Sequence, residues 1–284
     1  MFAITDNMIS LGEFAPVRQS DCRRHYRGRN HLSATTLEWQ PGPSTPADPP
    51  YWDDMFSSSI RIGVAAARKT LKPALLVWGL MTGIALLYYL VPASKGSFEA
   101  LVDFQNRLGV LFPSVGMGLS VGILVEVVRV LISPQKRWTR ENTVNAVFNF
   151  IIWSVMGVTQ YYRYAWQVEV FGAGNSFMEL ATKVAFDQFI WTVIFANPYQ
   201  AILYLWKNNH YSWRAVSSIA TPFRTFWGTQ MLPMLVSNWA FWIPMAFLVY
   251  FFPPELQIPM AILAVTIWVI LLSFLTASTS KNDE

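Results

Sequence analysis

The chain has 284 residues, of which 53% are hydrophobic, 15% aromatic and only 13% charged, and its net charge is +4. Soluble domains carry about 25% charged residues, so this composition and a mean hydropathy of +0.31 exclude an ordinary soluble domain and indicate a polytopic membrane protein. The single cysteine excludes an internal disulfide, and the Lys and Arg residues of the connecting segments form no stripe suited to nucleic acid.

Residues 1–60 are predicted to form a flexible polar tail, because Pro41-Gly-Pro-Ser-Thr-Pro and Pro49-Pro50 break regular structure. No apolar run follows the basic residues of this tail, which argues against a secretory signal, and its acidic residues argue against a mitochondrial presequence. Residues 57–104 are interpreted as an N-terminal extension. Within it we expect a basic amphipathic helix over 57–72, lying on the membrane, and then the first membrane helix.

Six apolar runs are each long enough to cross about 30 Å of hydrocarbon. They cover residues 73–92, 108–132, 143–163, 183–206, 229–252 and 258–276, and residues 277–284 are left as a C-terminal tail. Lys and Arg are enriched in alternate connections, which places both termini on one side of the membrane. The expected fold class is therefore all-α, a polytopic helical membrane bundle of about six transmembrane helices.

The last two runs carry the most specific residue pattern in the chain. The pattern is Pro233-x4-Asn238-Trp239-x-x-Trp242, followed by Pro244, a turn at Pro253-Pro254, and Trp268-x3-Leu272-Ser273. Its order and spacing resemble the Mpv-seventeen/peroxisomal-membrane-protein family. Over residues 105–276 the resemblance also includes Gly157 with Tyr161, and Lys183-x3-Asp187-Gln188. The Arg that family members usually carry after the turn is absent, and Gln257 is the polar residue nearest to its place.

The resemblance implies a small integral protein of the mitochondrial inner or peroxisomal membrane, or of the plasma membrane in a bacterium. It implies a bundle in which five helices match the family and the first helix is an addition. Members of this family are described as channel-like, with a role in membrane permeability and homeostasis. The resemblance supplies no cargo.

Polar side chains within the apolar runs are the candidate functional residues, because a charge at the centre of a membrane helix costs about 2.5–3.5 kcal/mol. The candidates for a pore or polar path are Asn238, Asp187, Gln188, Glu126, Arg129, Asn145 and Asn149. The residues that carry the family pattern, Pro233, Trp239, Trp242, Pro244, Pro253, Trp268 and Ser273, are expected to be structural.

Each candidate has two interpretations. Asn238 lies between two prolines on nearly one helix face and either lines a cavity or hydrogen-bonds a neighbouring helix. Asp187 is close to the predicted N-terminus of the fourth helix. It either pairs with Lys183, one turn earlier, or forms part of a charged ring at the mouth of a conduit. Glu126 and Arg129, three residues apart, can neutralise each other, and Asn145 and Asn149 could join them in a polar vestibule. Gly118-x3-Gly122 and Gly79-x3-Gly83 permit close approach of helices.

Enzyme motifs are missing from the sequence. The three His residues do not have the spacing of a zinc site, and there is no P-loop, GxSxG or dinucleotide fingerprint. We therefore expect a protein that is not an enzyme and needs no cofactor or metal. The leading hypothesis is a passive conduit for small solutes or ions in the lipid bilayer, with homo-oligomers expected. The rival is a non-conducting protein that organises the membrane or recruits partners, and a membrane enzyme using only carboxylates is the third class.

Overall fold

The computed structural model describes residues 51–220 and 223–280 of the chain. These residues form helices and short connections, with no strand among them, so the all-α prediction is confirmed. The tail predicted for residues 1–60 lies outside the described residues up to position 50. From Tyr51 onward the chain is helical, so the last ten residues of that predicted tail are not irregular.

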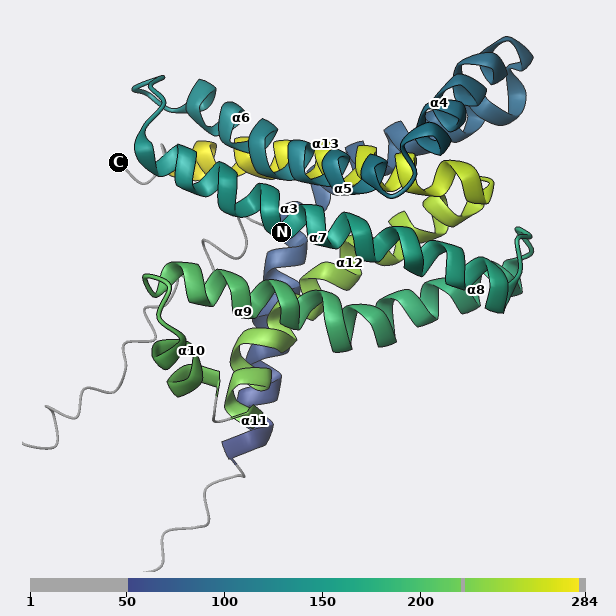
Figure 1. The fold of residues 1–284 in the computed structure, drawn as a ribbon. Helices are drawn as coiled ribbons and strands as arrows, with labels where there is room; N and C mark the ends of the chain where they lie inside the picture. The colour runs from purple at the N-terminus through teal and green to yellow at the C-terminus, as the bar shows by residue number, and fades with distance from the viewer. Residues whose placement is uncertain (1–50, 221–222, 281–284) are drawn as a thin grey trace, which may run out of the picture.

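Long helical rods alternate in direction along the chain (Figure 1). The first three segments are α3 (Tyr51–Leu90), η1 (Pro92–Ser94) and α4 (Lys95–Leu108). The next rod joins α5 (Leu111–Met117), η2 (Gly118–Leu124) and α6 (Val125–Ile132), and α7 (Arg140–Phe171) returns beside it. The rod after that joins α8 (Phe177–Ala185), η3 (Phe186–Ala196) and α9 (Asn197–Asn208). The chain closes with α10 (Trp213–Ala220), α11 (Phe223–Phe226), η4 (Trp227–Met231), α12 (Leu232–Phe251) and α13 (Pro254–Ser280).

Four helical segments of the described chain are long and apolar enough to cross a membrane: Met55–Leu90, Leu111–Ile132, Phe223–Phe251 and Pro254–Phe274. They make this an integral membrane protein, and they cover most of the first, second, fifth and sixth predicted spans. The rods of α7 and of α8–η3–α9 contain the other two. Both rods are long enough to cross, since the 32 residues of α7 alone measure about 48 Å. Their crossing stays a prediction.

Helix α3 differs from the expectation of a surface helix followed by a separate membrane helix. It is one helix of 40 residues that continues through Pro73. The reason is a single buried stripe along its whole length, at spacings of three, four or seven residues, formed by Met55, Ser59, Gly63, Thr70, Ala74, Val77, Met81 and Ala85. A stripe of that period packs against neighbouring helices, here α12, α13 and η4, so the segment over 57–72 is part of the bundle.

The main neighbour of α3 is α12, and the two helices run parallel. The Trp78 indole donates a hydrogen bond to the Phe241 carbonyl at 3.2 Å, and further along both helices the Tyr89 hydroxyl donates to the Phe251 carbonyl at 2.7 Å. Gly63 lies against the side chain of Val236, where a Cβ atom on the glycine would come within 2.7 Å of it.

The rod α5–η2–α6 packs tightly on α7 through glycines. A Cβ at Gly122 would lie 2.6 Å from the backbone nitrogen of Phe150, and a Cβ at Gly157 of α7 would collide with the backbone carbonyl of Pro113. Gly118-x3-Gly122 therefore lies at a helix–helix contact. Gly79-x3-Gly83 does not, because no described atom lies within 4 Å of either Cβ position. Oligomerisation through that open face stays a prediction.

The turn between α12 and α13 is built by Pro253 and Gln257. The Pro253 carbonyl accepts from the backbone N–H of Leu256 at 2.9 Å and so begins α13. The buried Gln257 amide donates to the carbonyls of Phe252 at 3.0 Å and Tyr250 at 3.4 Å, which would otherwise lack a partner at the end of α12. Helix α13 continues to Ser280, so residues 277–280 are helical and not part of a tail.

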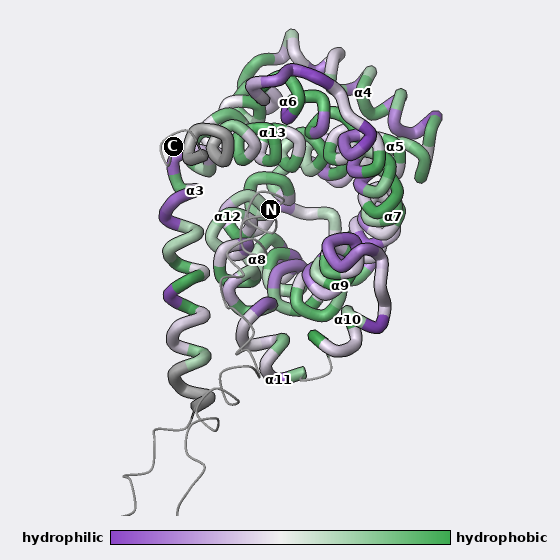
Figure 2. The backbone as a smooth tube through the Cα atoms, turned by 90° about the vertical axis from the view of Figure 1, so that its left-hand side faces the viewer, coloured by the Kyte–Doolittle hydropathy of each residue, from purple (hydrophilic) through white to green (hydrophobic). Residues whose placement is uncertain are grey.

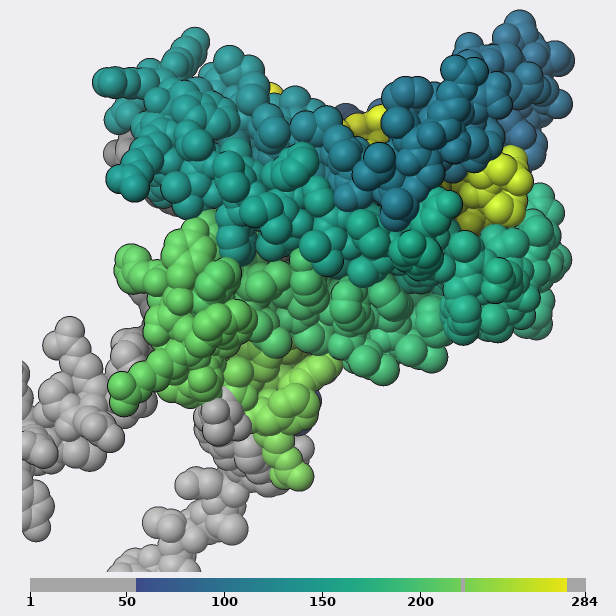
Figure 3. Space-filling view, in the orientation of Figure 1, coloured from purple at the N-terminus to yellow at the C-terminus, as the bar shows by residue number. Residues whose placement is uncertain are grey.

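The connections gather at two ends of the bundle. Tyr88, Pro253 and Glu255 lie around one hollow together with residues of α4, and Gln105 of α4 donates to the Glu255 carbonyl at 3.1 Å. Helix α4 projects from this end beside a saddle in the surface (Figure 3). Hydrophobic residues dominate the rods, and hydrophilic residues are more frequent in the connections and on α4 (Figure 2).

The connection from α7 to α8 also lies at the end that carries α4, since Phe177 stacks on Phe247 near the end of α12. Helix α8 begins with a capping box, in which the Ser176 hydroxyl donates to the Glu179 carboxylate at 2.6 Å and accepts from the Glu179 N–H at 3.4 Å. These hydrogen bonds from Ser176 hold the pKa of Glu179 below its usual value. The box fixes the point at which the chain turns back.

Candidate functional site

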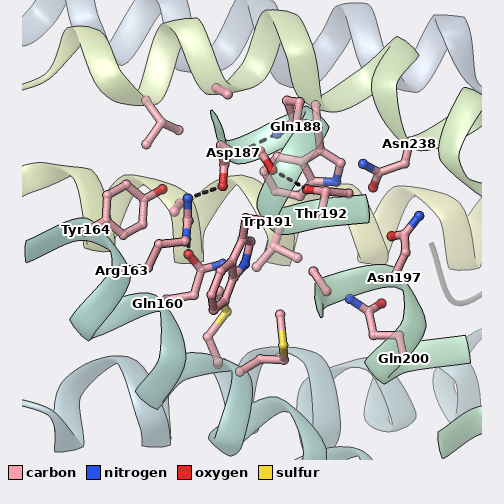
Figure 4. Close-up of a pocket in the computed structure, with 18 of the residues that line it drawn as sticks. Gln160, Arg163, Tyr164, Asp187, Gln188, Trp191, Thr192, Asn197, Gln200 and Asn238 are labelled. Atoms are coloured by element: carbon pink, nitrogen blue, oxygen red, sulfur yellow. Dashed lines mark hydrogen bonds and ion pairs between the residues drawn. The ribbon is translucent and has the colours of Figure 1, made fainter. Parts of the chain in front are cut away.

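A cavity of about 80 Å³ lies inside the bundle, between α7, η3, α9, α12 and α13 (Figure 4). One water-sized probe occupies about 10–15 Å³, so several waters or one small solute would fit. Apolar side chains from α12 and α13 form one part of the wall. The polar side chains of the wall are Gln160, Arg163, Asp187, Gln188, Thr192, Asn197, Gln200 and Asn238.

The helical spacing explains why the polar side chains meet. On α7, Gln160, Arg163 and Gln167 are three and four residues apart and share one face. On the opposite rod, Asp187, Thr192 and Asn197 are five residues apart. That spacing would rotate off one face of an α-helix, but η3 is π-helical, with hydrogen bonds between residues five apart. The widened turn therefore aligns this second polar series, and the Thr192 hydroxyl donates to the Asp187 carbonyl at 2.7 Å.

The centre of the site is an ion pair between Arg163 of α7 and Asp187 of η3. Both residues are buried. The Arg163 guanidinium also donates to the Gln160 side-chain oxygen and, at 2.9 Å, to the Tyr250 hydroxyl, which donates to Gln167 at 2.7 Å. Its carbon Cζ lies 4.5 Å from the ring centre of Tyr164. The pair thus brings two opposite charges into the bundle and cancels them there.

Several buried polar atoms around the cavity have no hydrogen-bond partner among the described residues. Asn197 has 0% of its surface exposed, and neither its side-chain nitrogen nor its oxygen is paired. Three further buried atoms of the cavity wall lack a hydrogen-bond partner among the described residues: the Gln188 side-chain oxygen, the Trp191 indole nitrogen and the Arg163 Nε. A buried polar group without a partner costs about 1–3 kcal/mol, so a molecule that enters the cavity and bonds to these groups would recover that free energy.

Three of the predicted pore residues meet at this cavity. Asn238 of α12 is half-buried and belongs to its wall, as do Asp187 and Gln188. The Gln188 amide donates to the Asp187 carboxylate at 3.2 Å. The position of Asn238 agrees with the first of its two interpretations, in which the side chain lines a cavity.

Of the two interpretations given for Asp187, the pairing with Lys183 is wrong. Asp187 pairs with Arg163, and the buried Lys183 ammonium makes no hydrogen bond within the described chain. Nor does Asp187 lie near a helix N-terminus, because its rod begins ten residues earlier, at Phe177. The error arose from placing the start of the fourth run at residue 183, so that Lys183 and Asp187 would have been at the membrane surface.

Glu126 and Arg129 form the predicted pair, with 2.9 Å between the Arg129 nitrogen and the Glu126 oxygen. Glu126 is fully buried and also accepts from the Asn142 amide at 3.1 Å. Asn149 accepts from the Tyr204 hydroxyl at 2.9 Å, and Asn145 is half-buried. None of these residues belongs to the wall of the cavity, so the candidates fall into two groups.

The residues of the family pattern support the site. The Trp239 indole donates to the Gln188 carbonyl at 2.9 Å, and Trp242 lies in the cavity wall. Trp268 is buried and stacks on Phe241 with 3.7 Å between ring centres, and the Ser273 hydroxyl donates to the Val269 carbonyl at 2.9 Å. Pro233 lies where α12 contacts α3, and Pro244 lies within α12. Pro253 lies at the turn before α13.

Sequence reasoning missed several residues of the wall, namely Gln160, Arg163, Trp191, Thr192, Asn197 and Gln200. Arg163 is the last residue of the third apolar run, 143–163, and this position predicts a charge at the membrane surface, whereas α7 continues to Phe171. The spacing of Gln160, Arg163 and Gln167 is a signal that could have identified a polar helix face. No comparable signal marks Asn197, since its alignment with Asp187 requires the π-helical turn.

The described residues include no group of three or more His, Cys, Asp or Glu side chains placed to hold a metal ion. What the cavity offers is hydrogen bonding and a neutralised pair of charges. Comparison of the chain with protein-family models, with characterised proteins and with solved structures gives no match.

Proposed function

We propose that this protein is a channel-like passive conduit for small solutes or ions, and that it contributes in this way to membrane homeostasis. The observation that carries the proposal is the polar cavity in the interior of an integral membrane protein, with an ion pair and unpaired polar groups in its wall. Polar and charged side chains within a membrane bundle are costly and mark pathways for solutes or ions.

Buried polar side chains on α7 also occur beyond both ends of the cavity, which supports the proposal of a longer pathway. Asn149, which is bonded to Tyr204, lies beyond one end and is separated from the cavity by Ile152 and Met156, and Gln167, which is bonded to Tyr250, lies beyond the other. These two positions are 18 residues apart, about 27 Å of helix, close to the roughly 30 Å thickness of the hydrocarbon core. The cavity lies between them.

The proposal includes six membrane crossings, with α7 and α8–η3–α9 as the third and fourth. These two rods have lower hydropathy than the other four because their polar faces meet each other inside the bundle. The resemblance to the Mpv-seventeen/peroxisomal-membrane-protein family supports the same assignment, together with a mitochondrial inner or peroxisomal membrane, or the plasma membrane if the organism is a bacterium.

The proposed mechanism is passive. A solute would enter from one end of the bundle, exchange hydration for hydrogen bonds with the cavity wall and pass the Arg163–Asp187 pair. This pair, held by Gln160 and Tyr250, joins the two polar rods at the cavity and is the proposed constriction.

The test is conductance of the purified protein in planar bilayers, together with solute-driven swelling of proteoliposomes. We expect activity in the wild type, and we expect Asp187→Asn to change its rate or selectivity, because the variant leaves the Arg163 charge unbalanced in the cavity wall. Glu126→Gln is the matched control, since Glu126 is also a buried carboxylate paired with an arginine but lies outside the wall. Folded wild type that passes neither ions nor solutes would contradict the conduit and favour the organising, partner-recruiting role.

A further inference from the structure

The unpaired polar atoms of the cavity are a balanced set of donors and acceptors. The Asn197 amide nitrogen, the Trp191 indole N–H and the Arg163 Nε–H are donors, and the side-chain oxygens of Asn197 and Gln188 are acceptors. All five atoms are buried and belong to residues in the wall of one cavity (Figure 4).

The charges of the same wall sum to zero. Asp187 neutralises Arg163, and the remaining polar groups are neutral amides, indoles and hydroxyls. An anion would meet the carboxylate of Asp187, and a cation would meet the Arg163 guanidinium and could use only the acceptors. An uncharged molecule with both donor and acceptor groups can use the whole set.

We infer that the cavity is a selective binding site for a small uncharged solute that carries both hydrogen-bond donors and acceptors, of the amide or urea type, in preference to ions. Asn197 is its principal recognition residue, because its two unpaired atoms match one donor and one acceptor on the same ligand. The inference rests on the proposed conduit, whose cargo it narrows to a chemical class.

The size of the cavity agrees with this class. About 80 Å³ is several times the 10–15 Å³ or so that one water-sized probe occupies, so a molecule of a few non-hydrogen atoms fits. Apolar side chains, among them Val249 and Val265, cover the part of the wall that faces no polar group. They favour a solute with low hydration over a strongly hydrated ion.

The experiment measures urea entry into proteoliposomes of the full-length protein by stopped-flow light scattering, with potassium and chloride flux measured on the same vesicles. Wild type should pass urea faster than either ion. Asn197→Leu should lower the urea rate roughly thirtyfold, because two hydrogen bonds of about 1 kcal/mol each are lost. Asn208→Leu, at an exposed position of the same helix, is the control and should leave the rate unchanged.

The outcomes separate this inference from the proposed function. Ion flux without urea flux, or a urea rate that Asn197→Leu does not change, overturns the inference and leaves a conduit. Vesicles that pass no ions and, in the swelling assay, none of the small solutes tested overturn the conduit itself. Asn197→Gln keeps the amide group, with its donor and its acceptor, and should retain part of the urea rate. This second variant tests the inference even if Asn197→Leu does not fold. Passage of water alone, with no urea, also counts against the inference.

Discussion

At the scale of single residues, the Arg163–Asp187 pair determines the electrostatics of the interior. Each charge is acceptable in the bundle only because the other is present, and Gln160, Tyr250 and Gln188 supply further hydrogen bonds to them. Removing one partner of a buried pair is more costly than replacing both, because the remaining charge stays buried without compensation.

Asp187→Asn should therefore lower the free energy of unfolding by about 3–5 kcal/mol, seen as a lower midpoint of thermal unfolding in detergent. Asp103→Asn, at an exposed position of α4, removes the same charge and should have little effect. A second change, Arg163→Met in the Asp187→Asn background, should restore part of the loss. If the double variant is less stable than Asp187→Asn, the buried-charge explanation is contradicted.

The sequence identified Asp187, Gln188 and Asn238 because a polar residue within an apolar run is conspicuous. It did not identify their partners. Arg163 was hidden by its position at the apparent end of a run, and Asn197 by a π-helical turn that no local pattern announces. The pair Glu126–Arg129 was predictable, because both members lie on one helix at a spacing of three.

At the scale of elements, glycines decide which helices approach closely. Gly118, Gly122 and Gly157 bring α5–η2 against α7, whereas Gly79 on α3 faces open space. All four lie in helices and look alike in sequence. The difference between them is tertiary, and for this reason the sequence could suggest the close contact without saying which glycine pattern makes it.

Gly157→Ala should destabilise the protein, because the new Cβ collides with the Pro113 carbonyl, a backbone atom that cannot move aside. The expected cost is about 1–3 kcal/mol, visible as a lower thermal midpoint. Gly79→Ala is the matched control. It meets no neighbour and should be neutral or raise stability by up to about 1 kcal/mol, since alanine favours a helix. Equal effects of the two changes would show that the α5–α7 contact is not as close as described.

Element boundaries were the least predictable part of the fold. The apolar runs located the rods, but α3 begins earlier than expected because its buried stripe continues through the polar half of the helix. Similarly, α7 extends eight residues past the end of its run at position 163, because Arg163 and Gln167 are bonded inside the bundle. A polar residue ends an apolar run in the sequence without ending the helix.

At the scale of the whole molecule, the number of crossings depends on the rods of α7 and α8–η3–α9. Four other segments are apolar enough to cross on their own. The two remaining rods are long enough, and their polar faces meet around the cavity, so they would cross as a pair shielded by the others. Composition could not establish that these two rods cross the membrane. The polar residues that lower their hydropathy are the same residues that form the candidate site.

Single cysteines introduced into a Cys22→Ser background test this arrangement with a membrane-impermeant thiol reagent on sealed, oriented vesicles. With six crossings, Gln135→Cys and Asn208→Cys should react from one side, and Ser97→Cys and Asn175→Cys from the other, because these exposed positions lie at opposite ends of the rods. Reagent on both sides of permeabilised vesicles controls for intrinsic reactivity. If α7 and α8–η3–α9 do not cross, Asn175→Cys reacts from the same side as Gln135→Cys. That result would place the cavity outside the hydrocarbon core and remove the main support for a conduit.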